Sequence, residues 1–232
     1  MAHNASTIAD SFLAHVATPD CDPTIQNLNQ VPVELSAISQ NRQSEIFINE
    51  KFTPENLLHQ SREGSYGIVH LATHVEFNPQ NAESSYIQFW NSRLPFERVQ
   101  EIGWENESLE LLVMSGCETA FGNEHSELGF AGLAIKSGVK SVLASLWQVD
   151  DRGTLELMNE FYRHLSSQNR TIKAEALRQA QLAMLQGNLL MENGELTWVG
   201  DRPQTSVSSD LPESSLSHPY FWAAFTLVGN PW

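Results

Sequence analysis

The sequence has little positive charge and no long apolar run, and each shortage excludes a class of function. Its 13 Lys and Arg residues stand against 28 Asp and Glu residues, a formal net charge of −15. Such a surface repels phosphate groups, so we expect no direct binding to nucleic acid. No apolar run approaches a membrane span, and the start, MAHNASTIAD, lacks the basic and apolar regions of a signal peptide. We therefore expect a cytoplasmic protein without a membrane partner.

Cysteine is also scarce. Cys21 and Cys117 are the two cysteines of the chain, which is too few for a disulfide framework, and in the cytoplasm they would stay reduced. Cys21 lies in the acidic, turn-rich stretch PDCDP, where neighbouring carboxylates disfavour a thiolate, and we interpret it as a bystander. Cys117 has different surroundings and is the better candidate for chemistry.

The 232 residues are enough for one sizeable domain. We expect a flexible N-terminus over residues 1–10 and a single domain over 11–232. Within it, the Gly/Ser/Pro/acid-rich segment 191–217 has the composition of a mobile loop.

Short apolar runs alternate with segments of helical periodicity. Helices are predicted from Pro32 and from Pro54, and over 94–102, 128–137, 153–165 and 172–185; strands are predicted over 12–17, 45–49, 66–74, 111–114, 139–146 and 221–228, with a hairpin arm at 86–90. This order, with nearly continuous apolar strands, predicts an α/β fold with a mostly parallel sheet and helices on both faces.

Two of the predicted strands end in chemically reactive side chains. The run LLVM, residues 111–114, is followed by SGCET and delivers Cys117, and the run YGIVHLATH ends at His74. In open α/β sheets, reactive groups gather at the carboxyl edge of the strands. If these two strands are neighbours in one parallel sheet, His74 and Cys117 emerge at the same edge.

Four segments in order, HLATH, LLVMSGCETA, GVKSVLASLWQVDD and HPYFWAAFTLVGNP, resemble the CHAT domain, a bacterial relative of caspases and separases. The likeness runs from about residue 12 to the C-terminus. It implies a caspase-like α/β fold and a peptidase with a His/Cys dyad, in which His74 is the histidine and Cys117 the nucleophile. We expect no cofactor and no metal.

The resemblance also implies a substrate pocket and an oxyanion hole. By similarity to separases, the acidic end of WQVDD matches a pocket for a basic residue before the cut, with Asp151 first and Asp150 second. The backbone N–H groups of Val75 and Cys117 match the oxyanion donors. Val75 departs from the family, which usually has glycine there, and a valine side chain would narrow the cleft.

Several of these residues have simpler interpretations. Cys117 could be a buried structural thiol, and the two aspartates could cap the helix that follows them. His70 and His74 form an H-x-x-x-H pair, but four residues along a strand span ~13 Å, too far to share one metal ion. We therefore expect His70 to be a hydrogen-bonded core histidine.

The leading hypothesis is a regulated cysteine endopeptidase that cleaves a protein substrate after Arg or Lys. Besides that substrate, a regulatory protein or a tetratricopeptide-repeat region is a candidate partner, since CHAT domains often follow such repeats. One alternative, favoured by Val75, is a catalytically weak CHAT-like module that acts in protein–protein signalling. Another is a thiol hydrolase or acyltransferase acting on small amides. No tetratricopeptide repeat occurs in this sequence, which leaves open whether the chain is a piece of a longer protein.

Overall fold

The main sheet has six strands in the order β11-β8-β7-β3-β1-β2. A computed structural model describes residues 11–15, 28, 30–41, 43–63, 66–78, 81–104, 108–115, 128–147, 149–167, 172–187, 189–192, 195–198 and 216–232. The strands are β1 (Ser11–His15), β2 (Ser44–Ile48), β3 (Ile68–Ala72), β7 (Leu111–Met114), β8 (Ser141–Ser145) and β11 (Phe225–Gly229). All neighbours are parallel except β11, which is antiparallel to β8. The predicted mostly parallel sheet is confirmed.

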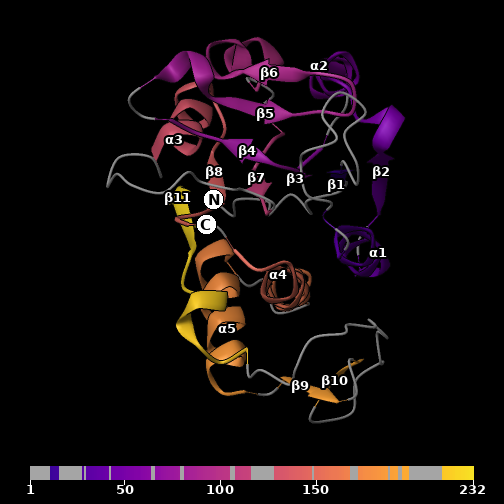
Figure 1. Cartoon of the computed structure of the whole chain (residues 1–232), viewed down its shortest axis with the longest axis vertical. Helices are drawn as coiled ribbons and strands as arrows, with labels where there is room; N and C mark the ends of the chain where they lie inside the picture. Colours follow the sequence, from indigo (N-terminus) through magenta and orange to yellow (C-terminus); the bar gives the residue numbers. More distant parts are fainter. Residues whose placement is uncertain are drawn as a thin grey trace, which may run out of the picture.

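Three helices cover one face of this sheet, below it in Figure 1: α1 (Val31–Asn41), α4 (Asp151–Leu165) and α5 (Lys173–Leu185). In α1 the apolar residues at helical spacing, Val31, Leu35 and Ile38, are at most 4% exposed. They pack in one buried cluster with residues of α4 and α5. The apolar residues whose spacing predicted these helices thus form the surface by which the helices contact one another and the sheet.

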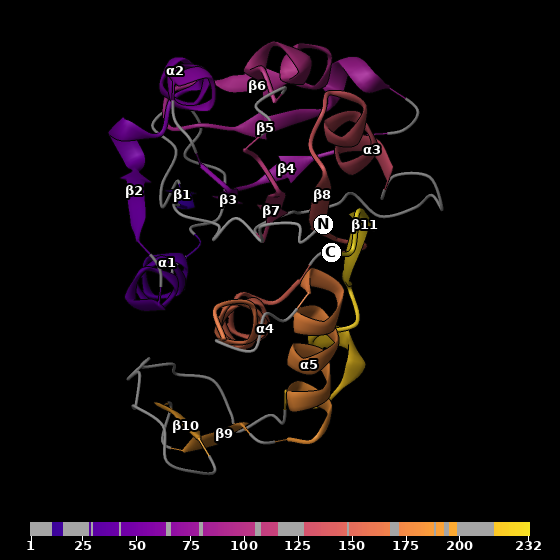
Figure 2. The ribbon, with the colours of Figure 1, turned by 180° about the vertical axis from the view of Figure 1, so that it is seen from behind.

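The opposite face carries α2 (Pro54–Glu63), α3 (Leu128–Lys136) and a small antiparallel sheet in the order β4-β5-β6. Its strands are β4 (Val75–Glu76), β5 (Tyr86–Gln88) and β6 (Arg93–Pro95), and short 3-10 segments flank them: η1 (Asn49–Lys51), η2 (Ala82–Ser84) and η3 (Phe96–Ile102). Figure 2 shows this layer from behind, above the main sheet. The helix predicted over 94–102 is wrong in type, because β6 takes its first residues and the rest is η3. Gly103 ends η3 in a left-handed conformation, at φ 74°.

The hydrophobic core has two halves, one on each side of the sheet, because successive strand residues point to opposite faces. On β3, Ile68 and Ala72 face the α1/α4/α5 layer, whereas Val69 and Leu71 face the α2/α3 layer. On β7, Leu111 and Val113 share the first side with Leu143 of β8. This alternation fixes which side of the sheet each polar strand residue occupies.

Beyond α5, β9 (Leu189–Glu192) and β10 (Glu195–Trp198) pair as an antiparallel hairpin. It lies at the end of α5 in Figure 1 and falls partly within segment 191–217. The N-terminal segment 1–10 and residues 199–215 are outside the described part of the chain. In the part that is described, no helix is both long and apolar enough to cross a membrane.

Candidate active site

The two strands that deliver the predicted dyad lie side by side. β3 pairs in parallel with β7, with Ile68 opposite Leu111 and Leu71 opposite Met114, a constant offset of 43 residues. The Ser115 N–H donates to the Leu71 carbonyl at 3.2 Å, which carries the contact one residue past β7. Cys117 itself lies outside the described residues, which stop at position 115 and resume at 128.

His74 follows β3 at the carboxyl edge of the sheet, and its backbone is fixed by β5. The Gln88 N–H donates to the His74 carbonyl at 2.9 Å, and the Thr73 hydroxyl donates to the Gln88 carbonyl at 2.7 Å. The His74 side chain is 9% exposed. The turn between β3 and β4 is therefore held at both the main chain and a side chain, a rigid support for an imidazole.

Val75 begins β4, and its side chain packs in the core rather than over the sheet edge. It is 2% exposed, lies opposite Ile87, and belongs to the cluster on the α2/α3 side. The Gln88–His74 hydrogen bond flanks the Val75–Ile87 pair, so this pair is of the non-hydrogen-bonded type and the Val75 N–H points away from β5. The Val75 side chain was expected to narrow a cleft. It lies instead in the hydrophobic core on the α2/α3 side.

His70 is a hydrogen-bonded core histidine, as expected. It is fully buried. Its Nδ1 lies 2.9 Å from the Tyr162 hydroxyl, and its Nε2 lies 2.8 Å from Ser115 Oγ and 3.0 Å from Glu34 Oε1. The imidazole thus joins α1, β3, α4 and the residue that follows β7.

Sequence reasoning missed Glu34 and Tyr162 as partners of His70. Nothing in the sequence marks Tyr162 as a polar partner, because a tyrosine on a helix face is typical of a hydrophobic core. Glu34 could have been found: it lies on the same helix face as Val31 and Ile38, and an acidic residue in an apolar stripe is exceptional. At 2% exposed, such a carboxylate needs a polar partner.

The two candidate substrate-binding acids have different roles at the start of α4. Asp150 is the N-cap: its Oδ1 accepts from the backbone N–H groups of Arg152, at 3.0 Å, and Gly153, at 3.2 Å. Arg152 Nε lies 3.4 Å from the same oxygen. The capping interpretation therefore holds for Asp150. Asp151 is the first residue of the helix and is half-buried.

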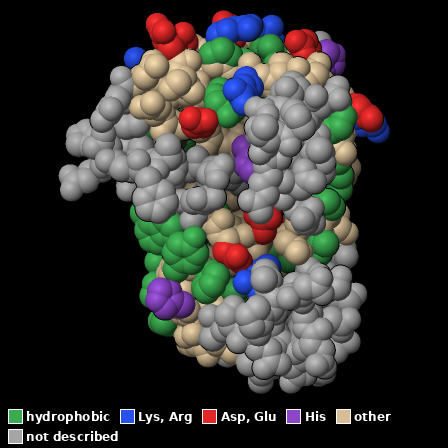
Figure 3. All heavy atoms as spheres, viewed as in Figure 1, with side chains coloured by type: hydrophobic (Ala, Val, Ile, Leu, Met, Phe, Trp, Pro, Cys, Tyr) green, Lys and Arg blue, Asp and Glu red, His purple; other side chains and the backbone are tan. Residues whose placement is uncertain are grey.

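Burial raises the pKa of Asp151 to about 6, with further contributions from the negative charges of Asp150 and Glu34. A helix N-terminus favours a negative charge, but burial and the two like charges outweigh that effect here. Because β8 is parallel to its neighbour β7 and α4 follows β8, Asp151 lies at the carboxyl edge of the sheet, the edge at which His74 also follows its strand. Figure 3 shows the surface of the molecule in the orientation of Figure 1, with acidic side chains in red and histidine side chains in purple.

Gly153 sets how closely the start of α4 approaches the last 3-10 segment, η4 (Pro219–Phe221). A Cβ at this position would lie 2.9 Å from both Phe221 Cβ and the Phe221 carbonyl oxygen. We expect Gly153→Ala to lower the free energy of unfolding by about 1–3 kcal/mol through overpacking, measured by urea denaturation. Asn159→Ala, at a half-buried position on the same helix, is the control; an equal effect of both changes would contradict the packing argument.

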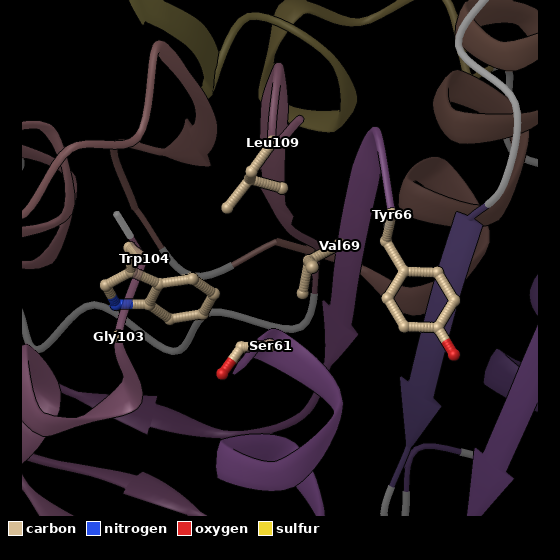
Figure 4. Close-up of a pocket in the computed structure, with 6 residues that line it drawn as sticks. All are labelled: Ser61, Tyr66, Val69, Gly103, Trp104 and Leu109. Atoms are coloured by element: carbon tan, nitrogen blue, oxygen red, sulfur yellow. The ribbon is translucent and has the colours of Figure 1, made fainter. Parts of the chain in front are cut away.

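A small pocket lies at the opposite edge of the sheet, where β3 and β7 begin (Figure 4). It is lined by Ser61, Tyr66, Val69, Gly103, Trp104 and Leu109, none of them charged. Its place separates it from His74. Among the described side chains, no three His, Cys, Asp or Glu residues gather closely enough to hold a metal ion.

The family model of the CHAT domain matches residues 3–230. Among solved structures, the chain is similar to the Arg-specific cysteine proteinase gingipain R (RgpB), with a TM-score of 0.57, 13% identity, and coverage of 96% of this chain and 46% of that one. A complex of Porphyromonas gingivalis RgpB pro- and mature domains is similar at a TM-score of 0.49 and 12% identity, covering 77% of this chain and 43% of that one. No curated protein matches.

The likeness to gingipain R confirms the caspase-like α/β fold, and at 13% identity it shows the fold alone. This chain spans less than half the length of that proteinase.

Proposed function

Since the chain belongs to the CHAT domain family, we propose that it is a cysteine endopeptidase in which Cys117 is the nucleophile and His74 its general acid and base. One observation carries the proposal. The offset of 43 residues in the β3–β7 pairing is also the separation between His74 and Cys117. Neighbouring strands lie ~4.8 Å apart, so the same register continued past the strand ends would bring the two side chains opposite each other.

The chemistry divides among a few groups. His74 takes the Cys117 proton, and the thiolate attacks the scissile carbonyl carbon to form a tetrahedral intermediate. His74 then gives its proton to the leaving amine as the C–N bond breaks, which leaves a thioester. A water molecule, deprotonated by His74, attacks the thioester and releases the acid and the thiol.

The oxyanion of the intermediate needs donors that are already in place. The N–H of Val75 is suited to this role, because β-pairing directs it away from β5 and the side chain is anchored in the core. The N–H of Cys117 is the proposed second donor. This arrangement weakens the alternative of a catalytically weak signalling module, since Val75 was the feature that favoured it.

For the substrate, we propose a protein with a basic residue before the cut, bound by Asp151. Asp150 is occupied as the helix cap, which leaves Asp151 as the acid for the pocket. Gingipain R, which shares the fold, is Arg-specific, and this makes Arg the first side chain to test. The net charge of −15 also favours the approach of a basic segment.

The pKa of Asp151 gives this pocket a pH dependence. Because the carboxyl group titrates at about 6, it is ionised at pH 7 and largely protonated at pH 5. We expect KM for a peptide cleaved after Arg to rise about tenfold between pH 7 and pH 5, measured by initial rates. A peptide with Ala before the cut is the control, whose KM should lack this rise. A flat KM for the Arg peptide down to pH 5 would remove Asp151 from the pocket.

A further inference from the structure

We propose that His70 is a positioning residue for Cys117, acting through Ser115. This inference rests on the proposed role of Cys117 and goes beyond it, because His70 touches neither substrate nor nucleophile. Its task is to hold the end of β7, from which the segment that carries Cys117 departs.

The contacts of His70 are those of an anchor. Both ring nitrogens are within hydrogen-bond distance of partners, Nδ1 of the Tyr162 hydroxyl at 2.9 Å and Nε2 of Ser115 Oγ at 2.8 Å. Glu34 Oε1 is a third close group, 3.0 Å from Nε2. His70, Glu34, Ser115 and Tyr162 are each at most 2% exposed. With both nitrogens engaged, the ring cannot rotate without breaking a buried hydrogen bond.

Strand periodicity places the anchor on one face of the main sheet. His70 lies on the α1/α4 face of β3, the side to which Ile68 and Ala72 also point. Val113 points to the same side from β7, and Ser115 continues its row. His74 is four residues past His70, and Cys117 is two past Ser115. The His70–Ser115 contact therefore joins β3 and β7 just before the two strand ends that lead to the proposed dyad.

Ser115, the last described residue before position 117, is tied to β3 twice. Its N–H is bound to the Leu71 carbonyl and its hydroxyl to His70, so both its main chain and its side chain are tied to β3, the strand that leads to His74. The His70 imidazole therefore couples the ends of β3 and β7. In this proposal, the separation of these ends sets the distance between the Cys117 thiol and the His74 imidazole. The charged and titratable groups around it are Glu34 from α1 and Tyr162 from α4, with Asp151 of α4 near enough to Glu34 to interact electrostatically.

Ser115→Ala is the first test. We expect the variant to stay folded, because His70 keeps its contacts with Tyr162 and Glu34. Without the anchor, the Cys117 thiol should lose part of its pairing with His74. The midpoint of its alkylation by iodoacetamide should then move up towards the ordinary thiol pKa of about 8.5. The measurement follows the rate against pH, with the Cys117 peptide quantified by mass spectrometry. Cys21 in the same sample is the internal reference.

The same variant should lower kcat for the Arg peptide by about tenfold to a hundredfold with KM little changed, since misplacement affects the chemical step. Ser141→Ala is the matched control: Ser141 is a fully buried serine at the far edge of the same sheet, and its hydroxyl donates to the Asn230 carbonyl at 2.7 Å. It should leave the alkylation profile and kcat unchanged.

A pair of changes at His70 completes the test. His70→Gln keeps a donor near the place of Nε2 and should retain most of the wild-type alkylation profile, whereas His70→Leu should move it at least as far as Ser115→Ala does. The inference is overturned if Ser115→Ala and His70→Leu leave the Cys117 profile at its wild-type midpoint, or if Ser141→Ala shifts it equally. Alkylation needs no peptide substrate, so failure of the endopeptidase proposal would show separately, as absent cleavage by the wild type.

Discussion

Replacing either member of the proposed dyad should abolish cleavage. We expect His74→Ala and Cys117→Ala each to lower kcat/KM for a peptide cut after Arg by about 10⁴-fold or more, since residues that act as a unit in catalysis each carry nearly the whole effect. Without Cys117 no thioester forms, and without His74 the thiol is less ionised and the leaving amine receives no proton. Initial rates of peptide cleavage measure both effects.

Matched variants separate catalysis from folding. Cys21→Ala removes the other cysteine, and His59→Ala removes an exposed histidine on α2; neither should change kcat/KM by more than about twofold, the scale of surface substitutions. The residual kcat/KM of the double variant His74→Ala/Cys117→Ala should be no lower than that of either single variant, because the two residues act as a unit. Full activity in His74→Ala would show that another group serves the thiol.

Asp151→Asn should have the second largest effect, with opposite signs for activity and stability. We expect kcat/KM for cleavage after Arg to fall about a hundredfold, as when one partner of a desolvated charge pair is removed, while a peptide with Ala before the cut is little affected. Asp151→Lys should remove cleavage after basic residues altogether. If either variant cuts after Arg as fast as the wild type, Asp151 does not bind the basic side chain.

Stability should change in the other direction. The pKa of Asp151 is raised from 3.8 to about 6 by folding, so the folded state binds more protons in that window and loses stability as pH rises through it. Since the carboxylate is half-buried and solvent screens part of the effect, Asp151→Asn should raise the free energy of unfolding at pH 7 by about 1 kcal/mol. Most of the gain should be lost by pH 4, where the carboxyl group is protonated in the folded state, and the rest should disappear below the ordinary pKa of 3.8.

Urea denaturation at pH 7 and pH 4 measures this difference. Glu83→Gln, at an exposed carboxylate on η2, is the control and should change stability by less than about 0.5 kcal/mol at either pH. A loss of stability in Asp151→Asn at pH 7 would mean that the carboxylate has a stabilising partner, and a pocket for a basic side chain would then need another acid.

Much of the fold could be predicted from the sequence because its elements carry local signals. The buried strands β3, β7 and β8 are short apolar runs, and α1 shows its contact face as Val31, Leu35 and Ile38 at helical spacing. The direction of β11 could not be read, because pairing with β8 is a tertiary choice that leaves no trace in periodicity. The sequence also did not show that η3 is a 3-10 segment rather than an α-helix. The segment is short because β6 ends directly before it and Gly103 ends it.

Part of the candidate site could likewise be predicted from the sequence, and part needed the structure. A reactive residue directly after an apolar run marks His74 and Cys117, and the parallel β3–β7 pairing needed to bring them together is present. The separate roles of Asp150 and Asp151 needed the geometry of the helix start, since both are acids next to one another. The contacts of His70 with α1 and α4 join residues far apart in the chain, and only packing of the two helices on the sheet reveals them.

The most direct test of the central claim is labelling by an electrophilic peptide with Arg at the reacting position, read by mass spectrometry. The wild type should be modified once, at Cys117 and not at Cys21, and excess Arg peptide should slow the reaction. His74→Ala should slow it by at least about a hundredfold, because the thiol loses its base. Modification of both cysteines at equal rates, or a rate indifferent to His74, would contradict the dyad.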